Sequence, residues 1–312
     1  MANNSQSIHT EKEKIALLSV GSNTFLVLLK LIVGLTLGSI SIISEAIHSG
    51  MDLLASIVAY FSVKKSALAP DDDHSFGHGK YESVSGMFEA ILIFVAAVII
   101  IYEAGGKILE PTAEPMDPTL MLAGIAVMGI SALANAFVSS RLMKIAKKTE
   151  SIALESDAWH LRTDVYTSVG VLAGLVLIRL TGITILDSIV AIGVALVIMK
   201  AAYDLTQKSY KDLIDCSLTD DEIKRITTII CEHYSDYVSY HGLRTRRAGP
   251  EIFIEFHLVV DKSVSVEQSH DLTDHLEDDL KLEFPRAYVT IHVEPNTGEN
   301  AHKPSLCENT SK

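Results

Sequence analysis

The chain has 312 residues, enough for two domains, and it is unusually apolar, with 48% hydrophobic residues and a mean hydropathy of +0.28. The formal net charge of −13 falls mostly in the C-terminal third, which argues against a nucleic-acid-binding protein and suits cationic partners. Apolar residues are concentrated before about residue 205, so the sequence predicts a membrane domain followed by a polar domain.

The N-terminal part of the chain predicts an all-α membrane domain. Residues 1–13 are polar and lack the pattern of a cleavable signal peptide, so they are expected to form a cytosolic tail. Six apolar stretches within 14–208 are long enough to cross about 30 Å of hydrocarbon, which takes about 20 residues. The predicted spans lie near 14–36, 40–62, 84–104, 118–140, 155–179 and 184–204.

Lysine and arginine residues are unevenly distributed among the segments that flank these spans. The N-terminal tail and the 63–82 and 141–152 loops are rich in them, whereas the segments on the other side carry few. Because basic loops remain in the cytosol, both termini are expected there. We therefore expect a multi-pass protein of the inner (cytoplasmic) membrane, embedded in the lipid bilayer.

Two spans contain a histidine followed four residues later by an aspartate. These pairs are His48 with Asp52 and His160 with Asp164. Residues i and i+4 share a helix face, so each pair aims an imidazole and a carboxylate in one direction. Ionisable residues inside a membrane are functional candidates. Two such helices side by side predict a tetrahedral site for a divalent metal, with zinc as the first choice; interhelical hydrogen bonding is the alternative.

The same four residues suggest a link between metal and protons. A metal needs neutral imidazole and ionised carboxylate ligands, so metal ions and protons compete for the same atoms. Such a site can exchange one for the other, which is what an antiporter requires. Glu45 and Asp157 each precede a ligand histidine by three residues and are candidate partners of the site, with helix-end solvation as the alternative.

The loop Pro70–Lys80, PDDDHSFGHGK, is a second concentration of ligand types. Asp71, His74 and His78 have ligand spacing, and two glycines allow a tight backbone around them. The sequence predicts a loop metal site here, and the alternative is a solvated acidic loop.

A change of pattern near residue 209 predicts a small α+β domain over 209–296, with the order helix, strand, strand, helix, strand. The two adjacent strands are expected to form a hairpin that turns at 248–250. The polar tail 297–312 is expected to be disordered.

Alternation along the strands sorts the ligand types of this domain by face. His292 and Glu294 emerge together from the last strand, and His257 lies on the outward face of the second strand. With His241 and His270 they form a candidate cytosolic metal cluster, and ordinary surface histidines are the alternative.

Taken together, these features resemble the cation diffusion facilitator family of metal/proton antiporters, and most closely its bacterial ferrous-iron/zinc efflux branch. The resemblance extends from about residue 12 to 295 and rests on the paired motifs of spans two and five, the DDDHSFGHGKYES loop and the late IHVEP strand. It implies a homodimer whose cytosolic domains have a metallochaperone-like fold and bind regulatory metal. It also implies that the membrane quartet is the transport site.

The resemblance adds two further implications. Lys80 and Asp215 match the positions of an interlock at the dimer hinge of the family. The efflux branch often has aspartate at the position of His48, whereas a His/Asp pair on both helices is typical of zinc-preferring members. Because imidazole suits zinc, this favours zinc over iron or manganese.

The sequence therefore predicts a secondary active transporter, not an enzyme. It exports zinc from the cytosol in exchange for protons by alternating access, and zinc on the cytosolic domain regulates it. Cadmium, cobalt, iron or manganese are alternative substrates. A membrane metal sensor and an intramembrane metallo-hydrolase are alternatives from other classes, although all four ligands of the quartet are protein groups, which leaves no open position for a catalytic water.

Overall fold

A computed structural model of the chain describes residues 2–109, 118–181, 185–233 and 235–300. The chain divides into two compact units, Met1–Tyr210 and Lys211–Lys312. Most of the tail predicted as disordered, from residue 301 on, lies outside the described residues.

The first unit consists of long helices, and the predicted all-α membrane part is confirmed. The helices are α1 (Ala2–Leu37), α2 (Ile40–Ser66), α3 (Lys80–Leu109), α4 (Pro118–Thr149), α5 (Ile152–Thr181) and α6 (Ile185–Leu213). The last of these ends just inside the second unit. Helix α1 begins at Ala2, so the expected tail is already helical. Gly38, with a φ of +62°, permits the tight turn from α1 into α2, where the Ser39 hydroxyl caps the second helix.

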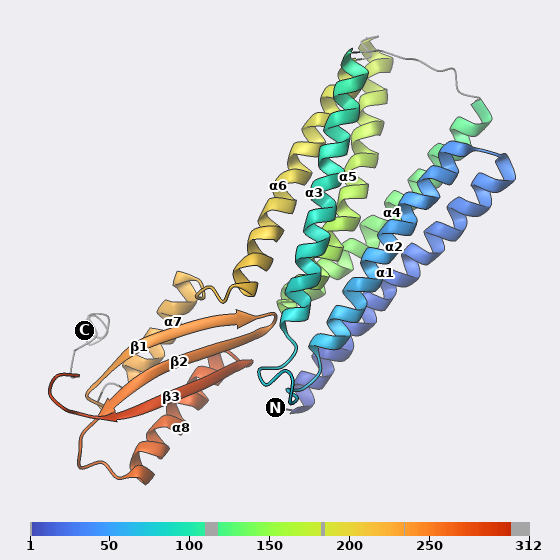
Figure 1. The fold of residues 1–312 in the computed structure, drawn as a ribbon. Coiled ribbons are helices and arrows are strands. Elements are labelled where there is room, and N and C mark those ends of the chain that lie inside the picture. Colours follow the sequence, from blue (N-terminus) through green and yellow to red (C-terminus); the bar gives the residue numbers. More distant parts are fainter. Residues whose placement is uncertain (1, 110–117, 182–184, 234, 301–312) are drawn as a thin grey trace. The chain divides into compact units, whose positions relative to one another are not determined.

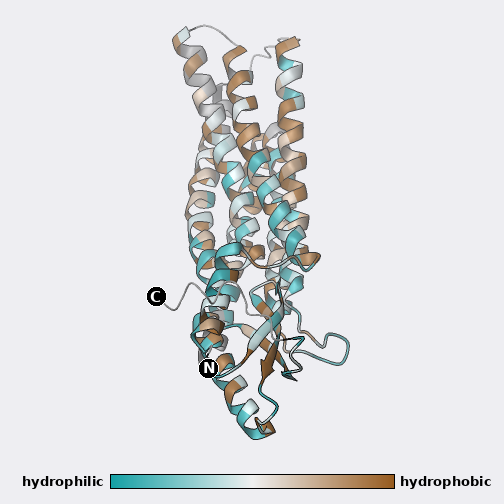
Figure 2. Cartoon of the chain, turned by 90° about the vertical axis from the view of Figure 1, so that its left-hand side faces the viewer, coloured by the Kyte–Doolittle hydropathy of each residue, from teal (hydrophilic) through white to brown (hydrophobic). Residues whose placement is uncertain are grey.

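Among the residues that the structure describes, five of these helices are long and apolar enough to cross a membrane. Their qualifying segments are His9–Leu37, Glu45–Ser66, Lys80–Leu109, Ile125–Thr149 and Ser188–Leu213. Large apolar side chains, such as Phe25, Ile32 and Phe88, are exposed on the outer faces of the helices, and Figure 2 shows apolar residues along much of the helix length. Such a surface suits lipid contact.

Inside the bundle, helices pack through small and aliphatic residues. One buried cluster joins α1, α2, α4 and α5 and includes Ala16, Val63, Leu142 and Ala158. Another joins α3 to α6 through Ile93, Ala97, Ile198 and Ala202. Figure 1 shows α3, α5 and α6 side by side. Small residues let helix backbones approach closely, and close packing holds membrane helices together.

The second unit has the predicted α-β-β-α-β order, which is confirmed. Its elements are α7 (Asp220–Glu232), β1 (Ser239–Ala248), β2 (Glu251–Val260), α8 (Val266–Glu283) and β3 (Ala287–Pro295). The sheet order is β1-β2-β3, with β1 and β2 antiparallel and β2 and β3 parallel. The hairpin turns at Gly249, whose φ is +61°.

One face of this sheet is covered by both helices of the unit (Figure 1). Ile226 and Ile230 of α7 and Leu276 and Leu280 of α8 belong to the same buried cluster as Ile254 and its neighbours on β2. Alternation then places the side chains of the intervening β2 residues on the opposite face. This is the face that carries the histidines.

Candidate metal centres

The structure brings together the four residues of the predicted quartet. Ligand atoms of His48 and Asp52 on α2 and of Asp164 on α5 all lie within 4.8 Å of one another. His160 Nε2, also on α5, lies 2.9 Å from Asp52 Oδ1. Because both pairs sit at i, i+4 spacing on facing helices, two imidazoles and two carboxylates converge on one region.

A cavity of about 110 Å³ adjoins the quartet. Besides His48, Asp52 and Asp164, its lining includes polar side chains from α1, α2, α4 and α5: Asn23, Lys30, Glu45, Ser49, Ser131, Asn135, Thr167 and Ser168. Ionisable side chains inside a membrane domain usually face the bundle interior or a water-filled cavity, where they mark ion sites. This cavity is therefore a suitable place for a metal ion.

The amide of Asn135 contributes to the quartet site, although the sequence alone did not predict it. Asn135 Nδ2, on α4, donates a hydrogen bond of 3.0 Å to Asp164 Oδ2. A partner of this kind fixes the orientation of a ligand carboxylate. The available signal was an amide inside an apolar span, since a buried polar side chain needs a partner.

Lys30 is a second contributor that was missed. Its ammonium on α1 donates to Ser49 at 2.8 Å and to Glu45 at 3.2 Å. Glu45 therefore accepts from Lys30, and Asp157 accepts from the Ser56 hydroxyl at 3.0 Å. Both carboxylates, predicted as partners of the site, have these polar partners on α1 and α2.

In the loop, the structure places Asp71, His74 and His78 with ligand atoms within 4.8 Å of one another. Asp71 Oδ1 is 3.0 Å from His74 Nδ1, and Asp71 Oδ2 is 3.3 Å from His78 Nε2. Desolvation acts to raise the pKa of Asp71, but the hydrogen bonds from His74 and the charges of both histidines outweigh it, so this pKa lies below its ordinary value. A carboxylate that stays ionised beside two imidazoles suits a cation.

Strand register brings three of the predicted cytosolic ligands into one row. His241 pairs with His257 across β1 and β2, and His257 pairs with His292 across β2 and β3. Their ring centroids are 4.9 and 5.0 Å apart. His257 Nδ1 is 2.7 Å from Glu294 Oε1, and ligand atoms of His241, His257 and Glu294 lie within 4.8 Å of one another. The hydrogen bond from His257 holds the pKa of Glu294 below its ordinary value.

The other predicted residues are placed differently. His292 Nε2 is 3.9 Å from Glu294 Oε1 and is largely exposed, so it lies at the margin of the cluster. His270 is on α8, where its ring lies 3.5 Å from Asp274 rather than in the row of histidines. Lys80 begins α3 in the first unit, and Asp215, in the second unit, accepts from Arg246 at 3.2 Å.

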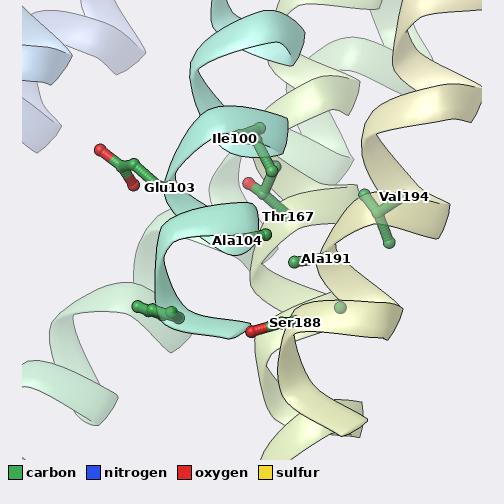
Figure 3. A pocket seen from close by; sticks show the side chains of 9 residues that line it. Ile100, Glu103, Ala104, Thr167, Ser188, Ala191 and Val194 are labelled. Atoms are coloured by element: carbon green, nitrogen blue, oxygen red, sulfur yellow. The ribbon is translucent and has the colours of Figure 1, made fainter. Parts of the chain in front are cut away.

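A second cavity of the helical unit has a different character. It has a volume of about 160 Å³ and lies between α3, α5 and α6, where Ile100, Ala104, Ala191 and Val194 line it (Figure 3). Figure 3 shows the Glu103 carboxylate pointing away from these side chains. Its lining contains no histidine, so among the described cavities the quartet cavity is the better metal site.

Comparison with known proteins covers both units. Residues 16–214 match the model of the cation efflux transmembrane domain, and residues 218–296 match that of the cation efflux protein cytoplasmic domain. An uncharacterised transporter of Synechocystis sp. is 35% identical, over 90% of this chain and 89% of that protein. The cation-efflux pump FieF of Shewanella oneidensis is 31% identical, over 89% of this chain and 92% of that protein. The solved zinc form of the transporter CzrB is 44% identical over 28% of this chain and 97% of that chain, with a TM-score of 0.26.

Proposed function

The chain belongs to the cation diffusion facilitator family and is a cation efflux transporter, and we propose that it exports zinc in exchange for protons. The observation that carries this proposal is the convergence of His48, Asp52 and Asp164, with His160 in contact with Asp52. Two imidazoles and two carboxylates form a donor set that zinc accepts in tetrahedral geometry.

Proton coupling follows from the chemistry of these ligands. The hydrogen bond between His160 and Asp52 contains a proton, and zinc needs the lone pairs of both groups. Zinc therefore enters as protons leave, and protons return as zinc departs. Alternating access to the quartet from the two sides of the membrane converts this exchange into antiport.

The second unit, Lys211–Lys312, has a regulatory role in this proposal. Zinc bound at His241, His257 and Glu294, with His292 and His270 available at the margin or from a second copy, links two chains into a homodimer. The match of this unit to a family domain named for dimerisation supports the assignment. The loop site at Asp71, His74 and His78 binds metal independently, and Lys80 with Asp215 holds the dimer hinge.

The distribution of lysine and arginine supports the orientation. Both termini face the cytosol, and the protein lies in the inner membrane of the cell. Zinc then moves outward while protons move inward down their gradient.

The test uses the full-length protein in vesicles that contain a zinc-sensitive dye. We expect zinc uptake that increases when a pH gradient is imposed and that moves protons in the opposite direction. Competition with cadmium, cobalt, iron(II) and manganese measures the preference, and zinc should compete best. A zinc flux that does not change with the pH gradient would contradict antiport. Stronger competition by manganese or iron(II) than by zinc would contradict the assignment of zinc.

A further inference from the structure

On its buried face, helix α3 carries two glutamates, Glu82 and Glu89, which lie two turns apart and are both 0% exposed. Glu82 accepts hydrogen bonds from Lys12, Ser66 and Ser151, so both of its carboxylate oxygens have partners. The ammonium of Lys12 compensates its charge. The carboxylate of Glu82 is therefore part of a complete hydrogen-bond network that includes a cation.

Glu89 has none of these partners. Neither of its carboxylate oxygens has a hydrogen-bond partner among the described residues. Helices α3 and α5 touch beside it, where the Ser156 hydroxyl lies 3.5 Å from the Gly86 carbonyl oxygen. The titratable group whose charge acts on Glu89 there is another carboxyl, that of Asp157, which is also 0% exposed and whose Oδ2 has no partner among the described residues. Glu89 thus meets a second acid where Glu82 meets a cation.

Two charged groups on the helices packed against α3 are engaged elsewhere. Lys208 of α6 pairs with Glu155 at 2.5 Å, and Asp52 of α2 contacts His160. Two adjacent buried carboxyls cannot both be ionised, because desolvation and mutual repulsion oppose the charge. His160, one turn along α5, offsets the charge of Asp157 in part, whereas the described groups that act on Glu89 include no cation. The neutral, protonated form is the one that this environment accepts.

The pair formed by Glu89 and Asp157 lies beside the quartet but is not part of it. Asp157 lies one turn before His160 on α5, and Ser56 lies one turn after Asp52 on α2. The Asp52–His160 contact is therefore followed one turn along by the Ser56–Asp157 hydrogen bond of 3.0 Å. Two layers of polar contact join α2 to α5, and Glu89 adjoins the second layer.

We propose that Glu89, facing Asp157, binds a proton inside the helical bundle at a site separate from the metal quartet, and that this proton takes part in transport. The proposal rests on the proton-coupled export proposed above and names a second proton carrier for it. In the closed bundle the proton is on Glu89. When the helices separate and water reaches the carboxyl, Glu89 ionises and the proton passes to water; closure reverses the step.

Infrared spectroscopy of the full-length protein in lipid vesicles tests the protonated state. A protonated carboxyl gives a carbonyl-stretch band that an ionised carboxylate lacks. We expect this band at neutral pH, its loss in Glu89→Gln, and its retention in the control Glu155→Gln, because Glu155 forms an ion pair with Lys208. A band of unchanged position and intensity in Glu89→Gln would overturn the proposal.

Transport tests the role of this proton. Glutamine has the shape of a protonated glutamate, so Glu89→Gln should fold and bind zinc at the quartet with wild-type affinity in calorimetry, yet move fewer protons per zinc ion. Glu89→Asp keeps a carboxyl, and we expect it to restore the proton-to-zinc ratio. A wild-type ratio in Glu89→Gln would overturn the role in transport.

The two measurements separate this inference from the proposed function. If the wild-type protein moves zinc without protons, proton-coupled export is wrong and Glu89 has no part in transport. The infrared band is recorded without transport, so it still decides whether Glu89 binds a proton.

Discussion

His160 Nε2 on α5 lies 2.9 Å from Asp52 Oδ1 on α2, and the two residues are 108 positions apart in the chain. The contact joins the two polar pairs, because each partner belongs to a different His-x-x-x-Asp motif. It also occupies one lone pair on each of two candidate ligands. A metal ion that bound through both atoms would have to displace the shared proton, which is the basis of the proton coupling proposed above.

The hydrogen bond from Asn135 to Asp164 leads to the first prediction. Asn135→Ala leaves the ligand carboxylate without its orienting partner, and zinc affinity at the quartet should fall by about 10–100-fold. Isothermal titration of the full-length protein measures it. Ser140→Ala is the matched control on α4, since Ser140 is exposed and, among the described residues, its hydroxyl bonds to the backbone of its own helix at Ala136. Equal affinities for the two variants would contradict the role of Asn135.

His48 is the candidate ligand on which metal choice is expected to depend. His48→Asp replaces an imidazole with a carboxylate and gives three oxygen donors with one nitrogen. Harder ions, such as manganese and iron(II), should gain relative to zinc, because oxygen ligands suit them better. Competition transport assays on the wild type and the variant measure the change. Unchanged selectivity would place the determinant of metal choice outside the quartet.

The buried ion pair between Lys12 and Glu82 predicts a stability effect. Both side chains are 0% exposed, so Lys12→Ala leaves an uncompensated carboxylate and should destabilise the helical unit by about 3–5 kcal/mol. Thermal unfolding in detergent measures it. The double replacement Lys12→Met with Glu82→Met removes both charges and should recover much of the loss. A single variant as stable as the wild type would show that the pair contributes nothing.

The lowered pKa of Glu294 predicts that the stability of the second unit depends on pH. The pKa of Glu294 is lower in the folded than in the unfolded chain. The ionised carboxylate therefore stabilises the fold above pH 4.5, the ordinary pKa of a glutamate, and this contribution is lost as the pH falls through the lowered pKa. Amide hydrogen exchange of β3 in a metal-free sample, above and below that pH, reports it. Glu294→Gln should remove this part of the dependence, and the same profile in both proteins would contradict the assignment.

Much of the fold follows from periodicity. Apolar stretches of membrane length predicted the six helices of the first unit. Strand alternation predicted that His257 and His292 share a face of the sheet, and the register pairs them there. The i, i+4 spacing correctly predicted that each His/Asp pair shares a helix face. These features depend on residues close together in the sequence, so a pattern is enough to predict them.

Contacts between distant helices were not predictable in the same way. Lys12 meets Glu82 across 70 residues, and Asn135 meets Asp164 across 29, through the way that the helices pack. His270 could not be placed by spacing because its position depends on where α8 lies relative to the sheet. Glu89 gave no signal either, since only the structure reveals that its neighbour is Asp157 rather than a lysine.

The central claim is that the quartet exchanges zinc for protons, and zinc-driven proton flux in vesicles tests it most directly. Reconstituted wild-type protein should move protons against zinc, and Asp52→Ala and His160→Ala should each abolish that flux. His275→Ala, an exposed histidine outside the three ligand clusters, should retain it. Flux at the wild-type level in the Asp52 and His160 variants would contradict the claim.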